Sequence, residues 1–146
     1  MNLNQLVNDT AFESFKRRND KTTTRPDNGF YDLGIAPSLI KDINRLNFEN
    51  PTPVQKESIP AGIHGDDIIV IAQTGSGKTM AYGIPMLQRL SKSKRGTGLV
   101  LVPTRELAIQ VEEAIQSYSR SINIRSAVLI GGASMILQLK ATNRSR

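Results

Sequence analysis

A glycine-rich stretch at residues 71–79, IAQTGSGKT, contains residue types suited to chemistry with phosphate. Gly75 and Gly77 allow the backbone to curl, so that successive N–H groups point at one anion. Lys78 supplies a mobile cation for the outer phosphates, and the hydroxyl group of Thr79 can bind Mg²⁺. The stretch therefore predicts a site for the phosphates of a nucleotide.

The residues around this stretch support that interpretation. The pattern of a phosphate-binding loop is G-x-x-x-x-G-K-[ST], and residues 72–79 match it with Ala72 in place of the first glycine. An apolar run precedes the loop, and a helix is expected after it, whose N-terminal end favours anions. The alternative is an ordinary strand-to-helix turn with a surface lysine. Such a loop predicts nucleotide binding but does not identify a reaction.

Two later segments could bind a second anion. In PTRELA, at residues 103–108, Thr104 and Arg105 stand at the start of an expected helix. The alternative is that Thr104 only caps this helix, with Glu106 favouring its dipole. Gly131-Gly132 allow a close backbone approach, although a plain turn fits them equally well.

Residues upstream of the loop could recognise a base. Thr52 and Gln55 have the spacing of a capping box at a helix start. The amide of Gln55 could instead pair with the edge of an adenine, through one donor and one acceptor. Phe30 and Phe48 are nearby aromatic residues that could stack on a base.

The elements that position these residues alternate between strands and helices. Apolar, β-branched runs predict strands buried on both faces, at residues 66–72, 99–102 and 126–132. Apolar periodicity and capping residues predict helices within 36–46, from 52 to a limit at Pro60, at 77–90 with kinks at Gly83 and Pro85, at 104–120, and from 134. The alternation predicts an α/β fold with a parallel sheet and helices on both faces.

Length and composition limit the other possibilities. A chain of 146 residues holds one domain or part of one. It has no apolar run long enough for a membrane span, no secretory signal and no cysteine, so we expect a cytoplasmic chain without disulfides. The net charge of +6 is weak support for nucleic-acid binding, because Lys140, Arg144 and Arg146 contribute half of it. We divide the chain into a flexible or partly helical extension (1–28), a core (29–139) and an atypical basic tail (140–146).

The set of motifs, in this order and spacing, resembles the first lobe of DEAD-box RNA helicases. The motifs are an isolated Phe30, NFENPTPVQ (47–55), AQTGSGKT (72–79), PTRELA (103–108) and GG (131–132). The Q motif of this family matches at Phe48, Pro51, Thr52, Pro53 and Gln55. Asn47 departs from the usual glycine, for which we expect a local backbone effect only.

The resemblance implies ATP, Mg²⁺ and RNA as ligands, with no implied oligomer. The implied ATP-binding residues are Phe30, stacked on adenine, Phe48, Thr52, Gln55 at the adenine edge, and Thr74, Gly75, Ser76, Gly77, Lys78 and Thr79 at the phosphates and Mg²⁺. The implied contacts with the RNA sugar-phosphate backbone are Pro103, Thr104, Arg105, Glu106, Gly131 and Gly132. Backbone contacts of this kind carry no base information, so binding would be independent of sequence.

The resemblance also indicates what the 146 residues lack. The acidic residues after Lys78 are Glu106, Glu112 and Glu113, and none of them closes an apolar strand as a Walker B carboxylate does. The Asp-Glu-Ala-Asp box and the second lobe are absent, so we expect ATP binding without turnover. Without the family's later strands, residues 66–72 would keep unpaired backbone groups, which predicts a weakly stable, aggregation-prone chain. The alternatives are a non-catalytic RNA- or nucleotide-binding fragment and a phosphate-loop ATPase of another family.

Overall fold

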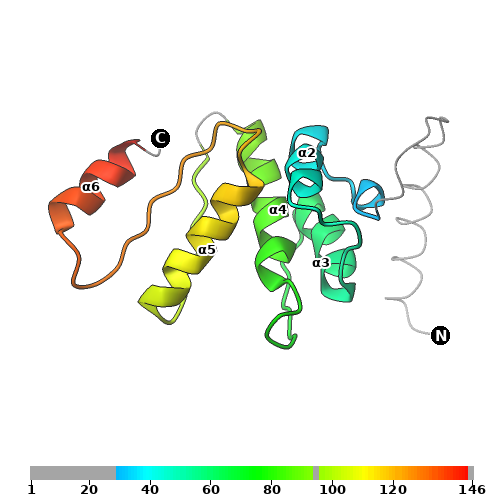
Figure 1. Ribbon diagram of the computed structural model, residues 1–146, viewed down its shortest axis with the longest axis horizontal. Helices are drawn as coiled ribbons and strands as arrows, with labels where there is room; N and C mark the ends of the chain where they lie inside the picture. The colour runs from blue at the N-terminus through cyan, green and yellow to red at the C-terminus, as the bar shows by residue number, and fades with distance from the viewer. Residues whose placement is uncertain (1–28, 94–95, 145–146) are drawn as a thin grey trace.

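A computed structural model describes residues 29–93 and 96–144, and the expected N-terminal extension lies outside them. The elements are helical throughout these residues (Figure 1). They are the 3-10 helix η1 (Tyr31–Leu33) and the α-helices α2 (Pro37–Arg45), α3 (Pro53–His64), α4 (Lys78–Lys92), α5 (Arg105–Tyr118) and α6 (Met135–Arg144). All five predicted helices are present.

Helices α2 to α5 share one hydrophobic core. Its fully buried side chains come from the residue before η1 and from α2, α3 and α4: Phe30, Leu39, Ile43, Ile59, Met80, Ile84 and Leu87. Val111, Ile115 and Tyr118 add one face of α5. Helix α6 stands apart at the end of a long extended segment (Figure 1). The core therefore supports the start of α4, where the predicted phosphate loop ends.

Helix α3 differs from its predicted extent. We expected Pro60 to limit the helix, but α3 continues through Pro60 to His64 and ends at Gly65, whose φ is 109°. A proline inside a helix forfeits one backbone hydrogen bond. Packing on the core offsets that loss, because Ile59 is fully buried next to Pro60. Pro85 likewise lies inside α4 and is buried.

The predicted strands are not formed among the described residues. Residues 66–72, 99–102 and 126–130 are extended segments without strand pairing, and exposure alternates along residues 68–72 and 99–102. Ile69 and Ile71 are 94% and 96% exposed, whereas Ile68 and Val70 are 42% and 37% exposed. A period of two is that of a strand with one covered face. Burial on both faces was wrong for these residues, because paired strands and a second covering layer are lacking among the described residues. The parallel sheet with helices on both faces stays a prediction.

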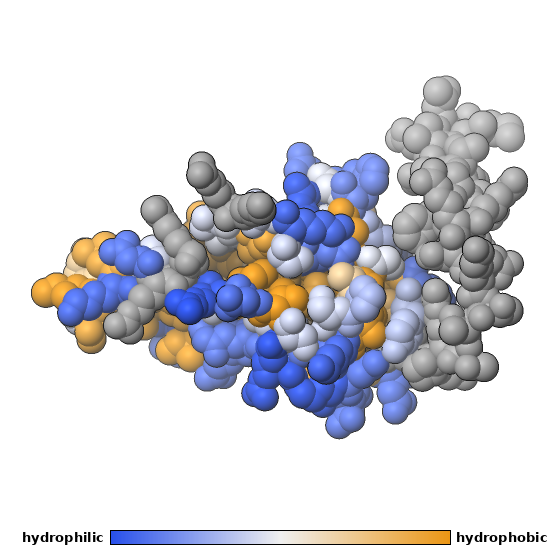
Figure 2. All heavy atoms as spheres, turned by 90° about the horizontal axis from the view of Figure 1, so that it is seen from above, coloured by the Kyte–Doolittle hydropathy of each residue, from blue (hydrophilic) through white to orange (hydrophobic). Residues whose placement is uncertain are grey.

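The uncovered faces leave apolar side chains on the surface. Leu99, Leu101 and Leu129 are also exposed, at 78%, 84% and 61%. In Figure 2 hydrophobic residues (orange) gather in patches on the viewed face and at the end of the molecule formed by α6. Among the described residues, none of the helices has the length and apolar character that a membrane span requires.

A buried carboxylate ties α2 to the end of α5. Asp42 is fully buried, and its oxygens accept hydrogen bonds from the backbone N–H and the hydroxyl of Ser121, at 2.7 and 2.8 Å. Arg45 pairs with the same carboxylate at 2.8 Å and donates to the carbonyl of Ser117 at 2.7 Å. These contacts fix the direction of α5, whose first turn carries the predicted anion-binding residues.

Candidate functional site

The predicted phosphate loop is curled as its glycines suggested. Gly75 and Gly77 have φ values of 81° and 86°, in the left-handed region that favours glycine. The N–H of Ser76 donates to the carbonyl of Gln73 at 3.3 Å. Helix α4 begins at Lys78 without a side-chain cap, so its first N–H groups keep their capacity for an anion.

Lys78 lies across the loop that precedes it. Its ammonium group donates to the carbonyl oxygens of Ala72 and Gln73, at 2.5 and 2.6 Å. To bind a phosphate, this group must exchange carbonyl partners for phosphate oxygens. The hydroxyl oxygen of Ser76 is buried and has no hydrogen-bond partner. The loop therefore offers backbone donors, one cation and an unsatisfied hydroxyl within a few residues.

Thr79 lies in the first turn of α4, close to Tyr82. Burial raises the pKa of Tyr82, and a hydrogen bond with the Thr79 side chain opposes that rise. A threonine hydroxyl has one donor and two acceptor sites, so this contact leaves it capacity for a cation. The described residues contain no group of three or more His, Cys, Asp or Glu that could hold a metal. An Mg²⁺ bound here would therefore take most of its oxygens from phosphate and water.

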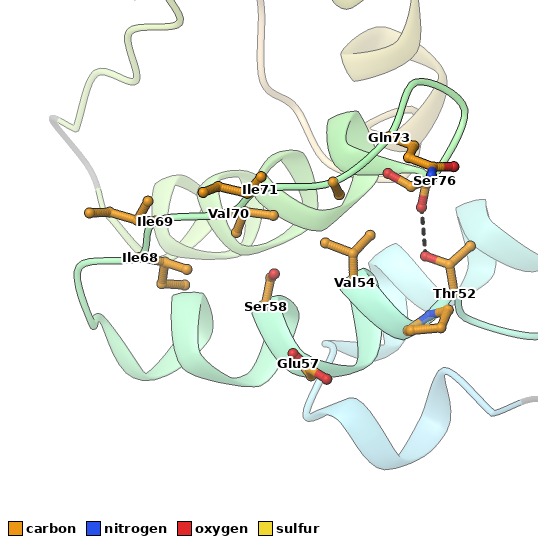
Figure 3. A pocket seen from close by; sticks show the side chains of 12 residues that line it. Thr52, Val54, Glu57, Ser58, Ile68, Ile69, Val70, Ile71, Gln73 and Ser76 are labelled. Atoms are coloured by element: carbon orange, nitrogen blue, oxygen red, sulfur yellow. Dashed lines mark hydrogen bonds between the residues drawn. The ribbon is translucent and has the colours of Figure 1, made fainter.

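Thr52 and Gln55 hold the phosphate loop from the start of α3. The predicted capping box is confirmed: the Thr52 hydroxyl accepts from the N–H of Gln55 at 3.4 Å, and the Gln55 side chain accepts from the N–H of Thr52 at 3.0 Å. The same hydroxyl donates to the carbonyl of Ser76 at 2.8 Å (Figure 3). The Gln55 amide donates to the carbonyl of Gly77 at 3.2 Å. Sequence reasoning missed both bonds to the loop.

Gly77 is packed directly against these side chains. A β-carbon at Gly77 would lie 2.3 Å from Nε2 of Gln55 and 3.4 Å from Oγ1 of Thr52. Gly75 has nothing within 4 Å of the corresponding position. The two loop glycines therefore serve different purposes. Gly77 leaves room for the side chains of Gln55 and Thr52, whereas Gly75 is required only for its left-handed backbone conformation.

An open groove of about 660 Å³ lies beside the loop, between α3 and residues 68–73 (Figure 3). Ile68 and Val70 line it from one side, and Val54 and Ser58 line it from α3. Gly75, Lys78 and Thr79 are not among its lining residues. Gln73 and Ser76 of the loop do line it, so the groove borders the phosphate loop on the side of these two residues.

The two predicted aromatic residues have different environments. Phe30 is completely buried in the core, so its ring has no face open to a base in this structure. Phe48 is 41% exposed. The N–H of Gly29 donates to the carbonyl of Glu49 at 3.1 Å, which brings the Phe30 and Phe48 segments together. Asn47 has a φ of 57°, a conformation in which glycine is favoured and asparagine is tolerated.

The residues predicted to contact RNA form a second, exposed cluster. Thr104 caps α5 by accepting from the N–H of Leu107 at 3.2 Å. The guanidinium of Arg105 lies against Gly131 and Gly132. A β-carbon on Gly132 would be 2.9 Å from Nη1 of Arg105, and Gly132 has a φ of 82°. The structure thus brings together two motifs that are about 25 residues apart in the sequence.

The remaining predicted residues of this cluster, Pro103 and Glu106, are exposed beside Thr104 and Arg105. One cationic side chain, a helix N-terminus and a glycine turn form a surface suited to a backbone phosphate. His64, at the end of α3, is exposed, and its Nδ1 lies 2.8 Å from Oδ1 of Asp66.

The sequence of this chain is similar to those of known helicases. The DEAD/DEAH box helicase family matches residues 52–146. The ATP-dependent rRNA helicase rrp3 of Neosartorya fischeri is 45% identical over 119 residues, which are 80% of this chain and 25% of the relative. The chain thus spans about a quarter of the length of that curated relative.

Solved structures give the same assignment. A DEAD box protein from the hyperthermophile Methanococcus jannaschii has a TM-score of 0.72 and 34% identity, covering 77% of this chain and 31% of that chain. The RNA-helicase Prp28 from Chaetomium thermophilum bound to ADP has a TM-score of 0.71 and 28% identity, covering 90% and 35%. The described fold is therefore that of a DEAD-box helicase lobe, and the chain belongs to the DEAD/DEAH box helicase family.

Proposed function

We propose that this chain is the ATP-binding part of an ATP-dependent RNA helicase. The observation that carries the proposal is the pair of hydrogen bonds from Thr52 and Gln55 to the carbonyls of Ser76 and Gly77. They couple the Q motif to the phosphate loop, so one binding event can engage both. In the helicase as a whole, ATP binding and hydrolysis would be coupled to the unwinding of an RNA duplex.

The proposed ATP site consists of the loop residues Thr74 to Thr79 together with Thr52, Gln55 and Phe48. Lys78 and the first N–H groups of α4 would bind the phosphates, and Thr79 would be the protein ligand of Mg²⁺. The side-chain amide of Gln55 is already bonded to backbone groups at both ends. These bonds use one N–H and one carbonyl lone pair of the amide, so contact between Gln55 and an adenine edge would use its second N–H and second lone pair. Phe30 is left out of the stacking contact, because it is buried.

RNA would be bound at the cluster of Pro103 to Glu106 and Gly131-Gly132. Its exposed backbone and its guanidinium suit phosphate groups, which predicts binding independent of base sequence. The names of the curated relatives make ribosomal RNA the first substrate to consider. A cytoplasmic location stays a prediction. Turnover by these residues alone is not expected, because none of the acidic residues after Lys78 closes an apolar run as a Walker B carboxylate does.

Titration calorimetry with ATP and with GTP tests the nucleotide part of the proposal. We expect ATP to bind more tightly than GTP, and this preference to disappear in Gln55→Ala. Gln110→Ala, at an exposed glutamine of α5, is the matched control and should behave as wild type. Equal affinities for ATP and GTP in the wild-type chain would contradict adenine recognition and favour a phosphate-loop ATPase of another family.

The second candidate function is non-catalytic RNA binding, which the exposed Arg105 and glycine cluster favours. It predicts weak, salt-sensitive binding of single-stranded RNA that is unchanged in Lys78→Ala. Fluorescence anisotropy of a labelled oligoribonucleotide at several salt concentrations measures this. Salt-sensitive RNA binding by a chain that gives no heat with ATP would support this second function over the first.

A further inference from the structure

One side chain of α6 binds the backbone on both sides of the Gly131-Gly132 turn. Oε1 of Gln138 accepts from the N–H of Ile130 at 2.8 Å. Nε2 of Gln138 donates to the carbonyl of Ile130 at 3.1 Å and to the carbonyl of Ala133 at 3.2 Å. The residue before the glycines and the residue after them are therefore fixed by the same amide group.

These bonds use the principal hydrogen-bonding capacity of the Gln138 amide. A glutamine amide has two N–H donors and a carbonyl acceptor, and here all three functions have a backbone partner. Two consecutive glycines are the residues that lose most conformational freedom when a turn becomes fixed. Fixing the residues on both sides of them is therefore an effective way to hold their N–H groups in one direction.

The rest of α6 does not explain why Gln138 lies there. Its apolar side chains are largely exposed: Met135, Ile136, Leu137 and Leu139 are 71%, 66%, 66% and 57% exposed. Figure 1 shows α6 apart from the helices of the core. The bonds of Gln138 are thus the principal described contact between α6 and the turn.

The same turn contacts Arg105. The Nη2 atom of Arg105 would be 3.5 Å from a β-carbon on Gly131, and Nη1 would be 2.9 Å from one on Gly132. A phosphate bound at this place would have to meet the guanidinium and the N–H groups of the turn together. Gln138 is bonded to the residues on both sides of these N–H groups.

We propose that Gln138 is a positioning residue for RNA binding, which holds the Gly131-Gly132 backbone in the conformation that presents it beside Arg105. The inference rests on the proposed RNA-binding function of this cluster. Gln138 acts through the backbone of Ile130 and Ala133 and does not itself contact RNA. Because Gln138 carries no charge, it would orient the N–H groups of the turn without attracting the phosphate electrostatically.

The test compares Gln138→Met with Gln110→Met, which makes the same change at an exposed glutamine of α5. The probe is a labelled single-stranded oligoribonucleotide, and its affinity is measured by anisotropy at several salt concentrations. We expect Gln138→Met to weaken RNA binding about tenfold, the loss typical of one or two neutral hydrogen bonds. The salt dependence should stay that of wild type, because no charge is removed. Affinity for ATP and the binding by Gln110→Met should be unchanged.

Amide hydrogen exchange provides the structural readout. In Gln138→Met the N–H of Ile130 should lose protection, while the N–H of Leu107, bonded to Thr104, should keep it. Loss of protection at both amides would mean that the variant unfolds. Gln138→Ala then replaces it, because alanine favours the helix, carries no charge and makes none of the three bonds, and RNA binding should again be weaker.

RNA affinity in Gln138→Met within twofold of wild type would overturn the role of Gln138 and leave the proposed function intact. An equal loss of ATP and RNA affinity would overturn it too, because the effect would then be global. A wild-type chain that binds no RNA would overturn the RNA-binding function itself, and the role of Gln138 with it.

Discussion

The phosphate loop and the glycine turn are two anion-binding candidates built in opposite ways. Side chains from α3 hold the phosphate loop, and the helix that follows it is anchored by fully buried residues such as Met80 and Ile84. The Gly131-Gly132 turn is exposed and depends on polar contacts with Arg105 and Gln138. The difference indicates that core packing fixes the first site in advance, whereas a few solvent-accessible contacts set the second.

The largest expected effect is a loss of stability at the phosphate loop, which is packed against the start of α3. Gly77→Ala places a β-carbon 2.3 Å from Gln55 Nε2 and also imposes a left-handed conformation on alanine, whereas Gly75→Ala imposes the conformation alone. The left-handed conformation costs about 1–2 kcal/mol in both variants. We expect Gly77→Ala to lose roughly 1–3 kcal/mol more, the cost of overpacking.

Urea unfolding followed by circular dichroism, without nucleotide, measures this difference. Gly75→Ala is the matched control, since the added carbon meets open space. Equal losses of stability in the two variants would show that the contact between α3 and the loop does not hold the loop in place.

The uncovered faces of the extended segments should govern self-association. Ile71 is 96% exposed in a segment that has the strand period but lacks strand pairing. We expect Ile71→Lys to weaken association by about 2 kcal/mol, the value of burying one isoleucine, and to leave the fold unchanged. Sedimentation at several concentrations measures this effect.

Val70→Lys is the control on the opposite, less exposed face of residues 66–72. A charge there should lower the stability of the fold and not the affinity of self-association. The wild-type chain is expected to be weakly stable and prone to association. A cooperative thermal transition of a wild-type monomer at all concentrations would contradict that expectation.

At the exposed Gly131-Gly132 turn, the guanidinium of Arg105 should contribute to RNA affinity and not to nucleotide affinity. Arg105→Ala should weaken RNA binding about tenfold. It should also reduce the slope of log affinity against log salt concentration by about one, the value for one phosphate contact. Arg89→Ala, at an exposed arginine in the last turn of α4, is the control for the loss of one positive charge. An Arg105→Ala chain that loses ATP affinity in parallel would mean that the two sites are not built independently.

The smallest effect is expected between these regions, at Asn47. Its φ of 57° should cost alanine about 1 kcal/mol and glycine nothing, because glycine adopts this conformation without strain. Asn47→Ala should therefore be less stable than wild type, and Asn47→Gly should match or exceed it in urea unfolding. A more stable Asn47→Ala would show that the left-handed conformation is not populated in solution.

Local chemistry predicted local structure well. Thr52 and Thr104 are side-chain caps where the sequence placed them, and the loop glycines have the required positive φ. The extent of α3 could not be predicted, because packing of Ile59 outweighs the effect of Pro60. The strands were expected from apolar runs, but pairing needs neighbours that a linear pattern does not supply.

Contacts between distant residues were beyond the reach of the sequence. Asp42 and Ser121 are 79 positions apart, and no local pattern links them. The bonds from Thr52 and Gln55 to Ser76 and Gly77 depend on how the start of α3 packs beside the loop, which no local pattern specifies. Gln138 lacked a signal of its own, since glutamine is equally common on the solvent face of a helix.

The most direct test of the nucleotide site is calorimetric titration of ATP into the wild-type chain, Lys78→Ala and Lys92→Ala. Lys92, exposed in the last turn of α4, is the matched control. Removing a charge-assisted partner of the phosphates should cost about 1.5–3 kcal/mol, or roughly 10- to 150-fold in affinity. We predict this loss in Lys78→Ala only. A folded wild-type chain that binds no ATP, or a Lys78→Ala chain that binds it equally well, would contradict the account.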